Sequence, residues 1–180
     1  MKARIALFSV LFPLIALART PPAAPAPAAP KLTGFRAEVI ANLDEVQEKI
    51  MDLAASTPAE KYSWRPARDV RSISEVYMHI ASANYFLATF LGIPVPKGAE
   101  RDLEKTVTKK AEALVELQKS FDHLRAAIAK TNNVEKQVKM FGNTTTHRGV
   151  MVTMLSHLHE HLGQSIAYAR MNGVTPPWSR

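Results

Sequence analysis

Residues 146–171, THRGVMVTMLSHLHEHLGQSIAYARM, constrain the fold most strongly, because they read as one long helix that no proline interrupts. Four of the six histidines lie in this segment: His147, His157, His159 and His161. At about 100° per residue, His157 and His161 point within about 40° of each other, whereas His159 points about 160° away from His161. Two imidazoles one helical turn apart can ligate a single metal ion. The segment therefore predicts a helix that offers two ligands from one flank.

Three further segments repeat apolar residues at helical spacing: about residues 33–55, residues 72–91, and a segment that begins at about Leu103 or Thr106 and ends at Lys130. The second begins with Ser72 and Glu75, which fit a capping box. Its predicted inward face consists of Val76, His79, Ile80, Ala83, Phe86, Leu87 and Phe90. Residues 138–142, VKMFG, suggest only a short extended piece, and no convincing sheet is visible. The pattern predicts an all-α protein, a four-helix bundle.

Aromatic residues also occur in the connection between the first two helices, at Tyr62 and Trp64. Aromatic side chains in a loop usually fold back and close the end of a bundle. The alternative is that they line the mouth of a pocket.

The N-terminal residues resemble a secretory signal. Lys2 and Arg4 precede an apolar run from Ile5 to Leu17, and small residues around Ala18 suit a signal peptidase. We expect a signal peptide over 1–18, a Pro/Ala-rich linker over 19–32 and a folded domain over 33–180. The protein would then be exported to the periplasm or the extracellular space, with no stable membrane span after cleavage. An uncleaved anchor is the alternative, although the run is short for one.

Charge and cysteine content exclude several functions. The formal net charge of +7 is spread along the chain, and no basic stripe with interleaved aromatics indicates nucleic-acid binding. The chain contains no cysteine, so disulfides, thiolate metal ligands and cysteine nucleophiles are all excluded. Since 47% of the residues are hydrophobic, the fold can rest on its apolar core.

A third ligand for the histidine pair is available in the second predicted helix. His79 lies in an apolar stripe, with the small Ala83 one turn on. A lone histidine in such a stripe is more often a core residue, and an isolated H-x-x-x-H pair often arises by chance. A bundle that brings His79 beside His157 and His161 would make them one metal site, because three buried imidazoles without an ion are costly. Glu75 and Gln164 are candidate partners for the outer ring nitrogens.

The remaining histidines are expected at the surface or in an interface: His159, His123 and His147. His159 and Glu160 begin the H-E-x-x-H pattern of zinc proteases, but Gly163 occupies its last position. That motif is therefore rejected, and Glu160 is expected in solvent.

Three neutral histidines leave one coordination position open, which is typical of a catalytic metal site. Zn, Ni, Fe or Mn would accept this donor set, so the sequence predicts a divalent metal of unknown identity. Such an ion could activate water or a thiol for attack on a small-molecule substrate. No catalytic residue beyond the ligands is assigned.

Two stretches together resemble a known family. KYSWRPARDVRSISEVYMHIASANYFL is similar to the first half of DinB/YfiT-like proteins, in which W-R-P and a histidine-bearing helix follow in this order. SHLHEHLGQSIAYARMNGVTPPWS is similar to their last helix, with H-x-x-x-H-x-G-Q and a P-P tail. The resemblance extends from about Phe35 to Ser179.

The resemblance implies a four-helix bundle, often a homodimer, with a divalent metal on His79, His157 and His161. Characterised members include metal-dependent thiol transferases and thiol-dependent isomerases. An exported chain would not meet the cytoplasmic thiol pool, so a hydrolase-like reaction stands beside the thiol transferase-like one. A non-catalytic bundle that binds metal or a partner protein is the alternative.

Overall fold

The structure, a computed structural model, describes residues 32–99 and 102–179. The predicted signal peptide (1–18) lies outside the described residues, as does the predicted linker apart from Leu32. The remaining part of the chain, Leu32–Arg180, is one compact unit. No helix of its described residues is both long and apolar enough to span a bilayer.

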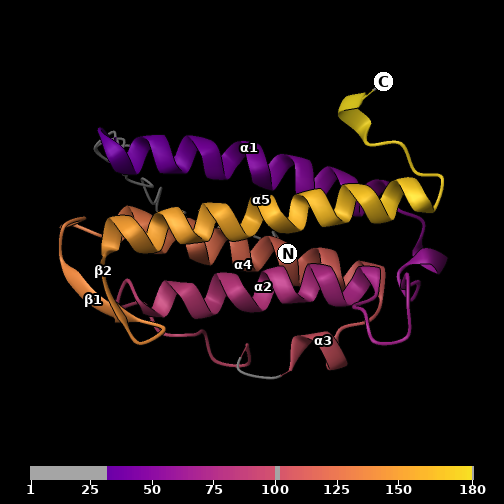
Figure 1. Ribbon diagram of the computed structural model, residues 1–180, viewed down its shortest axis with the longest axis horizontal. Helices are drawn as coiled ribbons and strands as arrows, with labels where there is room; N and C mark the ends of the chain where they lie inside the picture. Colours follow the sequence, from indigo (N-terminus) through magenta and orange to yellow (C-terminus); the bar gives the residue numbers. More distant parts are fainter. Residues whose placement is uncertain (1–31, 100–101, 180) are drawn as a thin grey trace, which may run out of the picture. The chain divides into compact units, whose positions relative to one another are not determined.

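Four long helices make up this unit, as predicted (Figure 1). They are α1 (Phe35–Ser56), α2 (Ile73–Thr89), α4 (Lys110–Lys130) and α5 (His147–Met171). Shorter elements join them: the single-turn helix α3 (Leu103–Thr106), the 3-10 helices η1 (Ala59–Lys61) and η2 (Pro177–Ser179), and the strands β1 (Gln137–Met140) and β2 (Asn143–Thr146). The chain is therefore an all-α four-helix bundle with one added hairpin.

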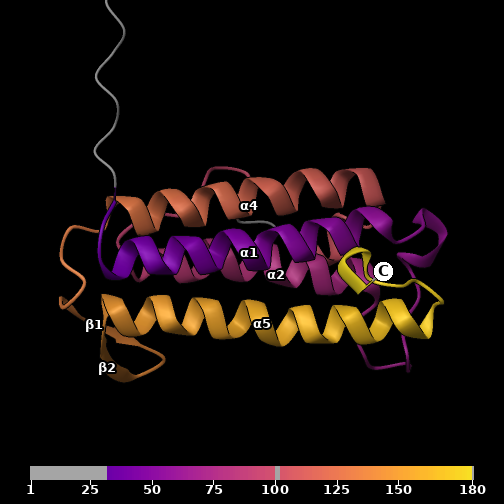
Figure 2. The same cartoon turned by 90° about the horizontal axis from the view of Figure 1, so that it is seen from above.

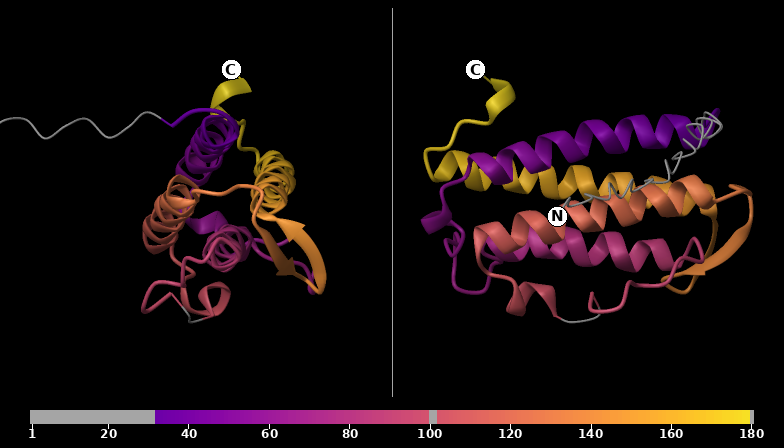
Figure 3. Two further views of the ribbon diagram at one scale, coloured as in Figure 1. Left: turned by 90° about the vertical axis from the view of Figure 1, so that its left-hand side faces the viewer. Right: turned by 180° about the vertical axis from the view of Figure 1, so that it is seen from behind.

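Each long helix contacts two others. Helix α1 packs against α4 and α5, and α2 packs against the same two helices from the other side (Figures 2 and 3). Helices α2 and α5 run in opposite directions, and the middle of α2 lies beside the middle of α5 (Figure 1). This arrangement places the predicted ligands of the two helices at the same level of the bundle.

The core is built from the apolar stripes of the four helices. Fully buried side chains come from every long helix: Leu43, Val46, Ile50, Met78, Ile80, Leu117, Phe121, Leu124, Val150, Met151 and Leu158. Burying a side chain of this size stabilises the fold by about 1.5–3 kcal/mol. Met78, Met151 and Met154 fill the core, which is the ordinary role of buried methionines.

The connection between α1 and α2 closes one end of the bundle. Tyr62 is 2% exposed, and its hydroxyl donates a hydrogen bond of 2.8 Å to the Ala54 carbonyl. Trp64 packs edge-on against Tyr168 of α5, with ring centroids 5.4 Å apart. The predicted folding back of these aromatics is confirmed.

Helix starts follow local chemistry. Ser72 and Glu75 form the expected capping box of α2, and the Thr146 hydroxyl accepts from the Gly149 amide at the start of α5. The predicted third helix is wrong at its beginning, because Leu103–Thr106 and Lys110–Lys130 are separate helices. Thr106, Val107 and Thr108 form a β-branched run at the break, and such residues lose side-chain freedom in a helix.

Strands β1 and β2 form an antiparallel hairpin, where the sequence suggested only an extended piece. Met140 pairs with Asn143, so Phe141 and Gly142 form a two-residue turn. Both have positive φ, 51° and 81°, as the tightest hairpin turns require. Phe141 therefore holds a left-handed backbone conformation that glycine or asparagine adopts more easily.

Candidate metal centre

Helices α2 and α5 bring His79, His157 and His161 together. One ring nitrogen from each lies within 4.8 Å of the others. The Nε2 atoms of His79 and His157 are 3.2 Å apart, and the ring centroid of His161 lies 4.7 Å from that of His79. His157 and His161 belong to the same flank because they are one turn apart on α5. The three histidines predicted as ligands therefore lie close together in the folded chain.

Helix α3 fixes the orientation of His79. The Nδ1 atom of His79 lies 3.1 Å from Oε1 of Glu104. The other carboxylate oxygen of Glu104 accepts a hydrogen bond of 2.8 Å from Nε of Arg71. Glu104 can accept a hydrogen bond from Nδ1–H of His79, which leaves the Nε2 lone pair of this ring directed at the other histidines.

Gln164 fixes His161 in the same way. Nδ1 of His161 lies 2.8 Å from Oε1 of Gln164, and Nε2 of Gln164 donates to the Tyr168 hydroxyl at 3.2 Å. The bond to Tyr168 sets the orientation of the amide, so its oxygen faces the imidazole. Gln164 was predicted as a partner of the triad, and the structure places it there.

Glu75, the other predicted partner, does not reach His79. Its carboxylate accepts from the Ser72 amide and pairs with Arg65 at 2.8 Å, so it serves the start of α2. Glu104, which was not predicted, is the partner of His79 instead. No helical period links Glu104 to His79, because the two residues lie on separate helices that only the fold brings together.

Burial favours the neutral form of His79 and His157. Burial lowers the pKa of His157 to about 4, and the nearby His161, His79 and Arg71 act in the same direction. Burial also lowers the pKa of His79; Arg71 and His161 act in the same direction, and Glu104 opposes them. Nδ1 of His157 is buried without a hydrogen-bond partner in the described structure. Neutral imidazoles are the form that binds a metal ion.

The other histidines lie away from this cluster. His159 and Glu160 are exposed, as predicted. His123 is half-buried, with its ring 5.3 Å from that of Tyr85. The prediction for His147 is wrong, because this residue is 6% exposed and its Nδ1 lies 2.9 Å from the Asn133 carbonyl oxygen. It sits at the first turn of α5, where the preceding loop covers it.

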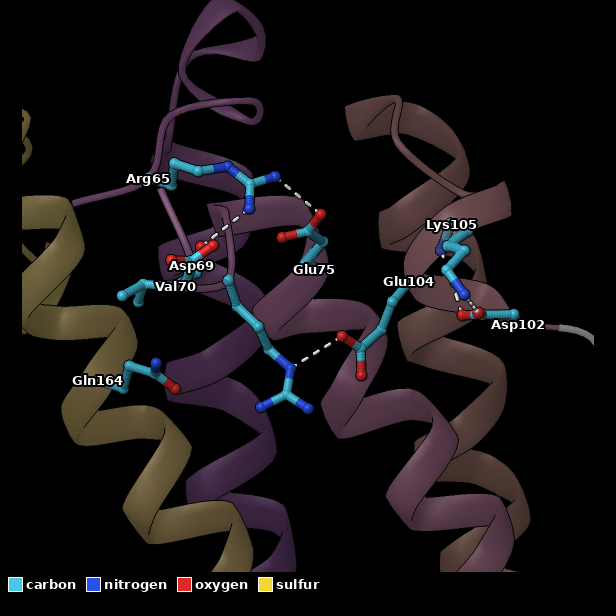
Figure 4. Close-up of a pocket in the computed structure, with 9 residues that line it drawn as sticks. Arg65, Asp69, Val70, Glu75, Asp102, Glu104, Lys105 and Gln164 are labelled. Atoms are coloured by element: carbon cyan, nitrogen blue, oxygen red, sulfur yellow. Dashed lines mark hydrogen bonds and ion pairs between the residues drawn. The ribbon is translucent and has the colours of Figure 1, made fainter. Parts of the chain in front are cut away.

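Two pockets flank the triad. The first, of about 760 Å³, is polar and contains the two supporting residues Glu104 and Gln164 (Figure 4). Its cations are paired with acids: Arg65 with Glu75, Arg71 with Glu104, and Lys105 with Asp102. The second pocket, of about 390 Å³, is largely apolar, and His79 and His157 themselves form part of its wall.

The donor set fits a divalent metal. Three histidines without a fourth protein ligand are the arrangement of a catalytic zinc-type site, and Ni, Fe or Mn would also accept them. In the part of the chain that the structure describes, the candidate group contains these three side chains alone. Three clustered histidines could therefore hold a metal ion and leave room for water or substrate.

Comparison with known proteins identifies the family. The DinB superfamily model matches residues 16–165. A DinB-like protein from Bacillus cereus has a similar structure, with a TM-score of 0.69 at 16% identity over 77% of this chain and 93% of that one. A DinB-like protein from Bacillus subtilis has a TM-score of 0.62 at 20% identity over the same shares of the two chains. No curated protein is significantly similar in sequence. Because the family model matches most of the length of this chain, the chain belongs to the DinB superfamily.

Proposed function

We propose that this protein is an exported, metal-dependent enzyme of the thiol transferase-like or hydrolase-like kind, with a divalent ion held by His79, His157 and His161. The observation that carries the proposal is the approach of three imidazole nitrogens to within 4.8 Å of one another. Glu104 and Gln164 support it, because each accepts a hydrogen bond from the outer ring nitrogen of one imidazole and so directs the inner nitrogen at the cluster.

A bound divalent ion supplies Lewis acidity, which lowers the pKa of water or a thiol and polarises a carbonyl group. The side chains around the site perform three tasks. The triad offers three imidazole donors, Glu104 and Gln164 hold the tautomers of His79 and His161, and the two flanking pockets give a small molecule access to the cluster. Our proposal therefore assigns the substrate to the pockets beside the triad.

Metal binding is tested by stoichiometry. The purified protein is stripped of metal, reloaded with Zn, Ni, Fe(II) or Mn in turn, and measured by elemental analysis. We expect about one ion per chain in the wild type and in His159→Ala, as in a single three-histidine site. His79→Ala, His157→Ala and His161→Ala should each lose the ion. Equal retention in all four variants would reject the metal site.

Catalysis is tested separately on the loaded protein. Thiol-conjugation and ester or amide hydrolysis are screened with the wild type and His79→Ala. A turnover that disappears in His79→Ala supports the enzyme. Metal uptake without turnover in any screen favours the alternative, a non-catalytic metal-binding bundle.

Export is tested at the N-terminus. In a bacterial host, the mature protein should be recovered outside the cytoplasm with Arg19 as its first residue, because signal peptidase cleaves after small residues such as Ala18. Full-length protein in the cytoplasmic fraction would reject export without affecting the metal proposal.

A further inference from the structure

We propose that the apolar pocket beside the triad binds the aromatic ring of an aryl-carbonyl substrate, whose carbonyl group then lies at the metal. The inference rests on the proposed function and names its substrate class. It concerns the pocket of about 390 Å³ that His79, Ala83, Phe86, Leu87, Phe141 and His157 help to line.

The position of the pocket links it to the chemistry. His79 and His157 belong both to its wall and to the metal cluster. His79, Ala83 and Phe86 follow one another along α2 at intervals of four and three residues, so they form one stripe that leads away from the cluster. A molecule in this pocket therefore has an end that touches the ligand histidines and a body that lies against apolar side chains.

The aromatic wall is not required by the bundle. Phe86 was predicted to face inward, yet it is 48% exposed, and Phe141 at the hairpin turn is 64% exposed. Their ring centroids are 6.1 Å apart, and Phe90 lies 5.7 Å from Phe141. Clustered exposed apolar side chains commonly mark a binding site.

The backbone of Phe141 adds weight to this interpretation. The turn at Phe141 needs a positive φ, which asparagine or glycine would adopt at lower cost. Turn geometry therefore does not explain a phenylalanine at this position. A binding role for the Phe141 ring in the pocket wall does explain it, because aromatic side chains favour edge-on contact with an aromatic ligand.

The polar pocket on the other side does not compete for this role. Arg65, Arg71 and Lys105 are each paired with an acidic side chain, so the pocket presents no excess positive charge to an anion. The body of the substrate is therefore expected to be uncharged. A carbonyl compound with one aromatic ring combines a group that a divalent ion polarises with a body that suits the apolar wall.

The test uses two hydroxamic acids that chelate a metal through the same group. Acetohydroxamate carries a methyl group, and benzohydroxamate carries a phenyl ring. Dissociation constants are measured by calorimetry on the zinc-loaded protein. We expect benzohydroxamate to bind about tenfold more tightly, because the ring buries more apolar surface.

Three variants locate the effect. Phe86→Ala and Phe141→Asn should bring the two dissociation constants to within about twofold of each other, since each removes a pocket wall of the kind that stabilises an aromatic ring. Asparagine suits the positive φ at this turn, so Phe141→Asn should keep the hairpin. Val115→Ala is the control, because Val115 is 54% exposed on α4 and does not line this pocket.

Each outcome decides a different point. Equal affinities for both hydroxamates in the wild type, or an unchanged ring preference in Phe86→Ala and Phe141→Asn, would overturn the inference while the metal site stands. Failure to take up zinc would reject the proposed function instead. Sedimentation of the same samples measures the oligomeric state. If the wild type is a dimer and both phenylalanine variants are monomers, a second copy of the chain covers these rings. That result would also overturn the inference.

Discussion

The carboxylate of Glu104 lies 3.1 Å from Nδ1 of His79 and joins the short helix α3 to the metal centre. The same carboxylate is held by Arg71, so its position does not depend on the imidazole alone. The single-turn helix α3 therefore holds a side chain that contacts a metal ligand. Glu104 acts as a positioning residue, because it reaches the cluster only through His79.

Replacing Glu104 tests this role. We expect Glu104→Ala to weaken metal binding about 10–100-fold, because partners of ligand histidines typically contribute that much. Glu104→Gln should recover part of the loss, since its amide oxygen can still accept from Nδ1. Metal dissociation constants are measured by competition with a chelating dye. Asp102→Asn is the control, because Asp102 caps α3 without touching His79; an equal loss in this variant would assign the effect to α3 as a whole.

Gln164 offers a second test on the other helix. Gln164→Leu keeps the volume of the side chain and removes the acceptor of His161, so metal affinity should fall about tenfold or more. Tyr168→Phe removes only the bond that orients the amide, and its effect should be smaller. The same dye competition measures both. If Tyr168→Phe lost more metal affinity than Gln164→Leu, the proposal that Tyr168 acts on His161 only through Gln164 would be contradicted.

Much of the fold followed from local patterns. The four long helices were predicted because their apolar residues repeat at helical spacing, and Ser72 and Thr146 lie at the expected starts. The triad was predictable in part, since His157 and His161 share a flank by periodicity alone. The addition of His79 needed the assumption that its helix packs beside the last one.

Features that depend on packing were not predictable in this way. Phe86 was predicted on the inward face, but the buried face of α2 is centred on Tyr77, Ala81 and Asn84, and Phe86 points to the opposite side of the helix. Glu104 reaches His79 only because α3 folds across α2. His147 looked exposed because helix geometry says nothing of the loop that covers it.

Acid should destabilise the metal-free protein through His157. Its pKa is about 4 in the folded protein and near the ordinary 6.5 in the unfolded chain. Between these values the unfolded chain binds a proton that the folded protein does not, so stability is full above pH 6.5 and falls as the pH drops toward 4. Urea unfolding at pH 7.5 and pH 5, with metal removed, should show a larger loss in the wild type than in His157→Gln. Equal losses would contradict the lowered pKa.

Metal binding should stabilise the fold, because the three ligands come from α2 and α5 and converge only in the folded chain. At a free ion concentration of one hundred times the dissociation constant, binding adds about 2.7 kcal/mol to the free energy of unfolding. For a domain of this size, the melting temperature should rise by roughly 5–10 °C. Calorimetry with and without the ion measures the shift in the wild type, in His161→Ala and in the exposed-site control His159→Ala. The shift should vanish only in His161→Ala; a shift that persists there would mean that the ion stabilises the protein from another site.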